Sequence, residues 1–274
     1  MTTLFIDGIA LWSPAWPGWD FAGAALASDT PRPAATGARP AGALLAANER
    51  RRAPDSVLVA LEVAQAALGQ AGLELATPAS VFTSTHGDLA IVDALCTTLA
   101  TDPLLLSPTR FHHSVHNAPS GYWAIAAECR RPSSAIAEFG HAFAAGMLEA
   151  TSQCAADGEP VLLVGVDTEA CGALASVNRS RGLLGVALVI GAQAGPRSRW
   201  RVNAELVAAP RSAPALRSTA ARVLADNAMA DALPFFEALA RGEATRLALP
   251  LGPRLAIDLV LEPLVTPRAA AAGA

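Results

Sequence analysis

The sequence predicts a layered α/β domain, because apolar strand-like runs alternate with helical patterns. Residues 161–166 are wholly apolar, which is typical of a strand in a sheet covered on both faces. Residues 183–190 form a further strand-like run, whereas residues 56–72 carry apolar side chains at helical spacing and end at a glycine. Strands and helices in this alternation build a sheet with helices packed against it.

The composition indicates a large buried core and excludes several functions. Of the 274 residues, 52% are apolar and 16% are charged, whereas an apolar share of roughly 45–50% is ordinary. We therefore expect an additional buried surface, such as a subunit interface. The net charge of −4 argues against nucleic-acid binding, which requires a basic face. All positive side chains are Arg, so no lysine is present for Schiff-base chemistry.

The N-terminus and the cysteines favour a cytoplasmic protein. The start of the chain, MTTLFIDGIALW, has no basic region ahead of its apolar residues, so we do not expect a signal peptide. No apolar run is long enough to cross a membrane. No C-x-x-C spacing is present, and we expect free buried thiols at the four cysteines, Cys96, Cys129, Cys154 and Cys171.

The first 100 residues predict two strands and two helices around an irregular segment. A first strand over 4–12 is followed by an irregular excursion over the surface between residues 16 and 45, with short helical turns. Asp55 is expected to cap the helix that begins near Ser56. The same role is expected of Asp88, for the helix that follows a strand at 81–85 and spans 89–99.

Residues 107–140 are the segment around which we expect the chain to be organised. A proline near its start leads into an amphipathic helix over 110–127, followed by a basic turn. The strand expected over 134–140 runs into a helix rich in small residues at 141–154. Beyond residue 200 the patterns weaken to a strand at 200–207, helices at 215–232 and around Phe235-Phe236, and one or two strands within 247–261, with a frayed tail after Pro263.

Three stretches resemble β-ketoacyl synthases of the thiolase fold. These are SPTRFHHSVHNAPSG at 107–121, the segment from Pro132 to Asp167, and ERRRAP at 49–54. The first stretch is most similar to short ketosynthase-like proteins found beside aryl polyene and related pigment pathways, and the last also resembles that subgroup. The resemblance implies a thiolase-like layered α/β fold with a ketosynthase-like N-terminal domain over 1–195. A shortened C-terminal segment over 196–274 is expected to pack on that domain.

The resemblance also shows what this chain lacks. Ketosynthases carry a nucleophilic cysteine between the 134–140 strand and the next helix, where the helix N-terminus favours the thiolate. Here that junction reads Ala-Glu-Phe-Gly-His over 137–141, so the degenerate nucleophile position falls on Phe139 or Gly140. The histidines that assist decarboxylation lie in the C-terminal half of the family, but all five histidines here precede residue 142.

The resemblance therefore implies a pseudoenzyme: a non-catalytic, chain-length-factor-like subunit that pairs with a catalytic β-ketoacyl synthase. Such a subunit limits chain length in aryl polyene or polyketide-type biosynthesis by completing the wall of the acyl tunnel across the dimer interface. Its partners would be that synthase, as a heterodimer, and an acyl carrier protein, with no cofactor. The residues expected at the tunnel or dimer interface are Phe111, Val115, Asn117, Tyr122, Trp123, Ala135 and Ala137, with Phe139 also facing the tunnel.

Other candidate residues leave alternatives open. Arg50, Arg51 and Arg52 could dock an acidic carrier protein or form a solvated patch. His112 and His116 have the i, i+4 spacing of metal ligands but no third ligand, and His141 could bind an anion or cap a helix. Cys171 would be a displaced nucleophile if the chain were an acyltransferase or thioesterase on the same fold. A carrier-binding scaffold is the third possibility.

Overall fold

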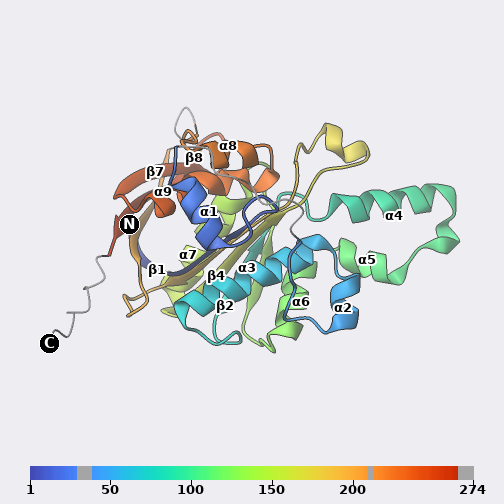
Figure 1. Cartoon of the computed structure of the whole chain (residues 1–274), viewed down its shortest axis with the longest axis horizontal. Helices are drawn as coiled ribbons and strands as arrows, with labels where there is room; N and C mark the ends of the chain where they lie inside the picture. Colours follow the sequence, from blue (N-terminus) through green and yellow to red (C-terminus); the bar gives the residue numbers. More distant parts are fainter. Residues whose placement is uncertain (30–38, 209–212, 265–274) are drawn as a thin grey trace.

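One mixed sheet with helices on both faces forms the body of the molecule (Figure 1). The computed structural model describes residues 1–29, 39–208 and 213–264. In spatial order the eight strands are β3 (Ser133–Ile136), β2 (Ala79–Thr83), β4 (Val161–Asp167), β5 (Leu184–Gly191), β1 (Thr2–Trp12), β6 (Trp200–Ala208), β8 (Leu255–Pro263) and β7 (Thr245–Pro250). The first three are parallel, and every other pairing is antiparallel.

The two faces of the sheet are covered by different sets of helices, so the protein has two apolar cores. The first core contains α1 (Trp19–Leu26), α7 (Ala142–Asp157), α8 (Thr219–Leu224), the 3₁₀ helix η3 (Ala228–Ala232) and α9 (Leu233–Arg241). The second contains α3 (Asp55–Ala71) and α6 (Ala118–Ala126). Leu163 of β4 lies in the first core and Leu162 in the second, which confirms the expected two-sided burial of this strand.

A helical arm projects from the body, at the right of Figure 1. We define the arm as residues 89–114, which form α4 (Leu89–Thr101), the 3₁₀ helix η1 (Pro103–Leu105) and α5 (Pro108–Ser114). Asp88 caps α4 as predicted, because its side chain accepts a hydrogen bond from the Ile91 amide. Next to α5 and α6 lies the short helix α2 (Ala47–Arg52), and η2 (Ala173–Ser176) lies in the loop after β4.

The structure corrects the prediction of a single helix over 110–127. The chain forms α5 and α6 instead, separated by residues 115–117. Pro119 is the physical reason: it has no amide hydrogen, and its ring would clash with the carbonyl of residue 115 if one helix continued through it. The Val115 carbonyl instead accepts from the Ala118 amide, in the turn before α6.

Other corrections follow from local capping and tertiary packing. The 16–45 excursion contains α1, which buries Ala22, Ala25 and Leu26 in the first core. Asp55 is the first residue of α3 and not its cap, a position that Pro54 holds. The predicted helix over 215–232 is broken between α8 and η3, because the Asn227 side chain caps η3 by accepting from the Met229 amide.

The remaining predicted elements differ only at their ends. β3 stops at Ile136, earlier than the predicted 134–140 strand. The predicted late strands form the β7–β8 hairpin. Strands β6, β8 and β7 continue the same sheet beyond β1. The predicted division of the chain into two parts at residue 195 remains a prediction. The predicted frayed tail lies outside the described residues, apart from Leu264. Within the described part of the chain, no helix combines the length and apolar character needed to cross a membrane.

Helix α3 packs so tightly on β1 that a side chain at Gly8 would clash with the helix backbone. A Cβ atom at Gly8 would lie 2.0 Å from the Ala67 carbonyl oxygen, whereas one at Gly69, within α3, meets nothing within 4 Å. We predict that Gly8→Ala lowers the free energy of unfolding by about 1–3 kcal/mol, because backbone must shift. The control Gly69→Ala should raise it by about 0.5–1 kcal/mol. Urea unfolding of both variants measures the difference, and equal stabilities would contradict the packing.

Candidate functional site

The carboxyl ends of β2, β3 and β4 meet at one edge of the sheet because these strands are parallel. The segments that leave this edge are 84–88 after β2, 137–141 after β3 and 168–172 after β4. The amino end of α7 also starts here, directly after residue 141. In α/β sheets this edge is where functional sites form, since helix N-termini and loop side chains converge on it.

Asp167, the last residue of β4, organises this edge. It is fully buried and accepts hydrogen bonds from the Ser84 hydroxyl at 2.6 Å and from the Thr85 amide at 3.0 Å. The His86 Nδ1 atom lies 3.8 Å from its carboxylate. Burial raises the pKa of Asp167, although these hydrogen bonds and His86 act in the opposite direction. The network therefore fixes the 84–86 segment against the end of β4.

A second carboxylate, Asp231 of η3, lies at the start of α7. Its Oδ2 atom accepts from the amides of Phe143, at 2.9 Å, and Ala144, at 3.3 Å. Burial raises the pKa of Asp231 to about 7, with Asp167 and Glu138 adding to the increase. The start of α7 is also tied to β2, since the Thr83 hydroxyl donates to the Ala142 carbonyl at 2.7 Å.

Several polar atoms around this edge are enclosed without a hydrogen-bond partner among the described residues. They include Oδ1 of Asp231, Oε2 of Glu138 and Nε2 of His86. In the part of the chain that the structure describes, no group of His, Cys, Asp and Glu residues has the arrangement of a metal site. His112 and His116 do not share a helix, because α5 ends at Ser114. His116 Nε2 is instead 3.1 Å from the Ser84 carbonyl.

The predicted nucleophile position carries no nucleophilic side chain. Phe139 is 65% exposed, and Gly140 has a positive φ of 86°. His141 precedes α7 at the N-cap position, but its side chain makes no capping hydrogen bond. Burial and nearby carboxylates raise the pKa of Cys171, which disfavours the thiolate that a displaced nucleophile would need.

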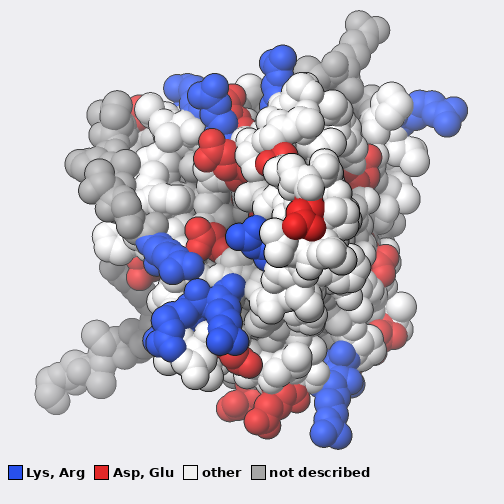
Figure 2. Space-filling view, turned by 90° about the vertical axis from the view of Figure 1, so that its right-hand side faces the viewer, with Lys and Arg blue, Asp and Glu red and all other residues white. Residues whose placement is uncertain are grey.

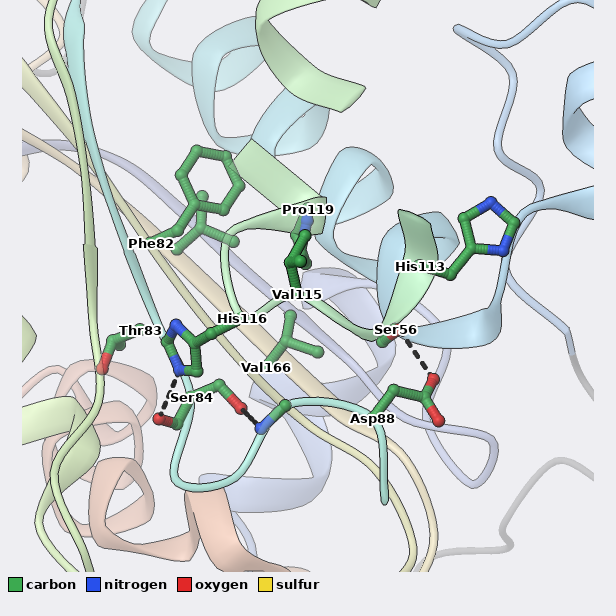
Figure 3. A pocket seen from close by; sticks show the side chains of 12 residues that line it. Ser56, Phe82, Thr83, Ser84, Asp88, His113, Val115, His116, Pro119 and Val166 are labelled. Carbon is green, nitrogen blue, oxygen red and sulfur yellow. Dashed lines mark hydrogen bonds between the residues drawn. The ribbon is translucent and has the colours of Figure 1, made fainter. Parts of the chain in front are cut away.

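A small apolar cavity separates the base of the arm from the sheet (Figure 3). Its volume is about 20 Å³, close to the space that one water molecule requires. Hydrogen bonds surround it: Ser56 donates to Asp88 at 2.9 Å, His116 contacts the Ser84 carbonyl, and His113 Nε2 is 2.8 Å from the Tyr122 hydroxyl. Its lining residues include Phe82, Val115, Pro119, Val164 and Val166.

The structure brings some of the predicted interface residues to the surface and buries one of them. Phe111, Val115 and Asn117 are exposed in or just after α5, and Ala135 and Ala137 are exposed in and after β3. Tyr122 is half-buried through its contact with His113. Trp123 lies in the second core and is 1% exposed. It therefore cannot contribute to an exposed tunnel wall or dimer interface, contrary to the prediction.

The arginine trio, Arg50, Arg51 and Arg52, forms the exposed last turn of α2. Positive charge at this end of a helix is favourable to the helix dipole, so the trio also has a local structural role. In Figure 1 α2 lies beside α5 and α6, at the same end of the molecule as the arm.

Sequence reasoning missed Asp231 and the central role of Asp167. Asp167 was recognisable as the polar residue that ends a wholly apolar strand. Asp231 carries no comparable signal, because it meets α7 from a position 88 residues later than Phe143. Only the packing of η3 against α7 brings the two together.

The solved structures that the chain matches share its fold. One is a chain of the complex between ketosynthase ApeO and its chain length factor ApeC from Xenorhabdus doucetiae, with a TM-score of 0.70, 22% identity, and coverage of 95% of this chain and 100% of that chain. Another is the ishigamide ketosynthase/chain length factor, with a TM-score of 0.68, 16% identity, and 96% and 100% coverage. A β-ketoacyl synthase from Burkholderia phymatum STM815 matches with a TM-score of 0.64, 11% identity, and 96% and 100% coverage.

These likenesses confirm the predicted thiolase-like layered α/β fold. No curated protein matches the sequence significantly. The model of the family described as β-ketoacyl synthase, N-terminal domain, matches residues 19–250, which is most of the chain. The chain therefore belongs to the family of β-ketoacyl synthase N-terminal domains.

Proposed function

We propose that this chain is the non-catalytic, chain-length-factor-like partner of a catalytic β-ketoacyl synthase in aryl polyene or polyketide-type pigment biosynthesis. In this role it forms a heterodimer, and its surface completes the wall of the tunnel that holds the growing acyl chain. The observation that carries the proposal is the apolar surface of the arm, which extends away from the body of the molecule.

The arm exposes large apolar side chains that a monomer would leave in water. Leu104 is 95% exposed, Leu105 is 72% exposed and Phe111 is 62% exposed. Figure 2 views the end of the molecule from which the arm projects, where acidic and basic side chains are spread over the face around uncharged areas. Large exposed apolar side chains gathered on one projecting segment are typical of sites of association. The arm is therefore suited to insertion against a second subunit.

The β3 edge of the sheet provides a second contact suited to a partner. β3 pairs with β2 on one side, and its exposed residues include Ala135. Ile125 of α6 and Phe139 after β3 are also largely exposed, at 76% and 65%. An open edge with apolar neighbours is an aggregation hazard unless another strand or subunit covers it. Pairing with a synthase across this edge would join the two sheets.

The similar structures support the choice of partner. Two of them are ketosynthase/chain length factor complexes, and a third, AntDE:AntF, is a type II polyketide synthase acyl-carrier protein in complex with its ketosynthase. The AntDE:AntF match has a TM-score of 0.70 at 10% identity. We extend these assemblies to the present chain because its exposed arm and open sheet edge require a partner surface.

The non-catalytic role rests on the residues at the strand-to-helix junction. None of residues 137–141 can form an acyl thioester, since they are Ala, Glu, Phe, Gly and His. The cavity at the base of the arm holds about 20 Å³, which is too little for an acyl chain, so we place that chain against the exposed face of the protein. Phe111, Val115 and Phe139 are exposed and supply bulk on that face.

The first prediction tests the heterodimer. Replacing Leu104, Leu105 and Phe111 together with Asp should abolish co-purification with a β-ketoacyl synthase encoded beside this chain, because charges would enter an apolar contact. The control is Leu255→Asp in β8, which is 52% exposed and lies outside the arm. Sedimentation velocity of the mixture measures association. If the unmodified chain stays a monomer that binds no such synthase, the proposed function is wrong.

The second prediction concerns the orientation of the arm. Tyr122→Phe removes the hydroxyl that contacts His113 and leaves a buried imidazole nitrogen without its partner. Loss of such a bond lowers the free energy of local unfolding by about 1 kcal/mol. Amides of the arm that exchange through local unfolding should therefore exchange roughly five-fold faster. The control Arg110→Gln changes an exposed side chain of α5. Equal exchange rates in both variants would show that this bond does not hold the arm.

The third prediction tests carrier docking by Arg50, Arg51 and Arg52. Exposed ion pairs contribute only ~0.2–1 kcal/mol each, so single substitutions should change carrier affinity little. Replacing all three with Glu should weaken binding of the heterodimer to acyl carrier protein, and more strongly at low salt. The matched control replaces the exposed Arg197, Arg199 and Arg254 with Glu. Calorimetric affinities that fall equally for both triple variants would indicate only a net-charge effect.

A further inference from the structure

We propose that Asp231 is the resident carboxyl group of the degenerate nucleophile site. Its Oδ2 atom occupies the amides at the start of α7 that would otherwise be available to a thiolate. The inference rests on the proposed function, because it concerns the nucleophile position that the proposed function treats as degenerate. It assigns a role to a residue of η3, far from the junction in the sequence.

The hydrogen bonds place Asp231 where a helix can stabilise a negative charge. The first amides of a helix have no partner within the helix, and Phe143 and Ala144 are the second and third residues of α7. Both donate to the same carboxylate oxygen, at 2.9 and 3.3 Å. The adjacent N-cap residue, His141, makes no such bond with its side chain. The amides of the first turn are therefore capped by a residue that is distant in the sequence.

The segment that carries Asp231 is held firmly in place. Asn227 donates to the carbonyls of Asp167, Arg181 and Gly182, which fixes the start of η3 against the end of β4. Met229 is fully buried, and a Cβ atom on Gly165 would lie 2.8 Å from its sulfur. Because η3 cannot shift without losing these contacts, the carboxylate is built into the site.

The charge of Asp231 opposes any second anion at the same position. Burial, together with the charges of Asp167 and Glu138, already raises the pKa of Asp231 to about 7. A thiolate at Gly140, one of the two candidate nucleophile positions, or at the N-cap residue His141 beside it would meet another negative charge. It would also compete for amides that are already occupied. A cysteine restored at the junction should thus remain a poor nucleophile while Asp231 is present.

The test introduces a thiol at the start of α7 and measures its pKa. His141→Cys is made alone and together with Asp231→Asn or Asp231→Ala, and alkylation by iodoacetamide is followed against pH with peptide mass spectrometry to resolve the site. With Asp231 present we expect a thiol pKa above the ordinary value of about 8.5. Asp231→Ala should lower it by at least one unit, which is roughly ten-fold more thiolate at neutral pH.

Asp231→Asn is the matched control for folding, since its amide oxygen can still accept both hydrogen bonds without a charge. It should lower the thiol pKa by less than Asp231→Ala, and it keeps the test decisive if the alanine variant does not fold. The same thiol pKa in the parent and in the asparagine variant would overturn the proposal. The assay uses the isolated chain, so its result is independent of whether a synthase binds.

Thermal stability against pH provides a second readout. The folded-state pKa of Asp231 is raised, so between about pH 4 and 7 the folded protein binds a proton that the unfolded chain releases. Melting temperature should therefore fall as pH rises through this window, and the slope should be smaller in Asp231→Asn. An unchanged slope would show that Asp231 does not have the raised pKa that its enclosure implies and would contradict the proposal.

Discussion

The burial of β4 on both faces is the constraint on which the rest of the structure depends. Every residue of this strand is buried, so helices must cover the sheet on both sides. Its last residue, Asp167, is then forced into the interior, where a carboxylate needs hydrogen-bond donors. Ser84 and Thr85 supply them, and the Asn227 side chain binds the Asp167 carbonyl. One strand thus brings the loop after β2 and the segment before η3 to the same edge.

That edge combines the architecture of a ketosynthase site with different chemistry. The parallel strands β2 and β4 and the start of α7 are arranged as the family membership leads one to expect. At the junction, however, Phe139 is turned to solvent and a carboxylate from η3 takes the amides of α7. The first amides of this helix bind the carboxyl group of Asp231, from a segment far away in the sequence.

The arm and the β3 edge expose apolar side chains, and contact with another subunit would explain this exposure. The arm is anchored at its base by His113, His116 and Asp88, whereas its apolar side chains farther out face away from the core. A rigid base with an exposed apolar end is suited to a fixed contact with another subunit. The cavity beneath the base holds about 20 Å³, which is too little for an acyl chain.

The sequence by itself determined the fold class, the strands β1, β2, β4 and β5, and the absence of a cysteine at residues 137–141, because periodicity, two-sided burial and residue identity are local properties. It also indicated the cap at Asp88. Only the tertiary structure decided that α1 is buried, that Trp123 lies in the core and that Asp231 meets α7. These features depend on contacts between segments far apart in the chain, and such contacts leave no periodic pattern in the sequence around either partner.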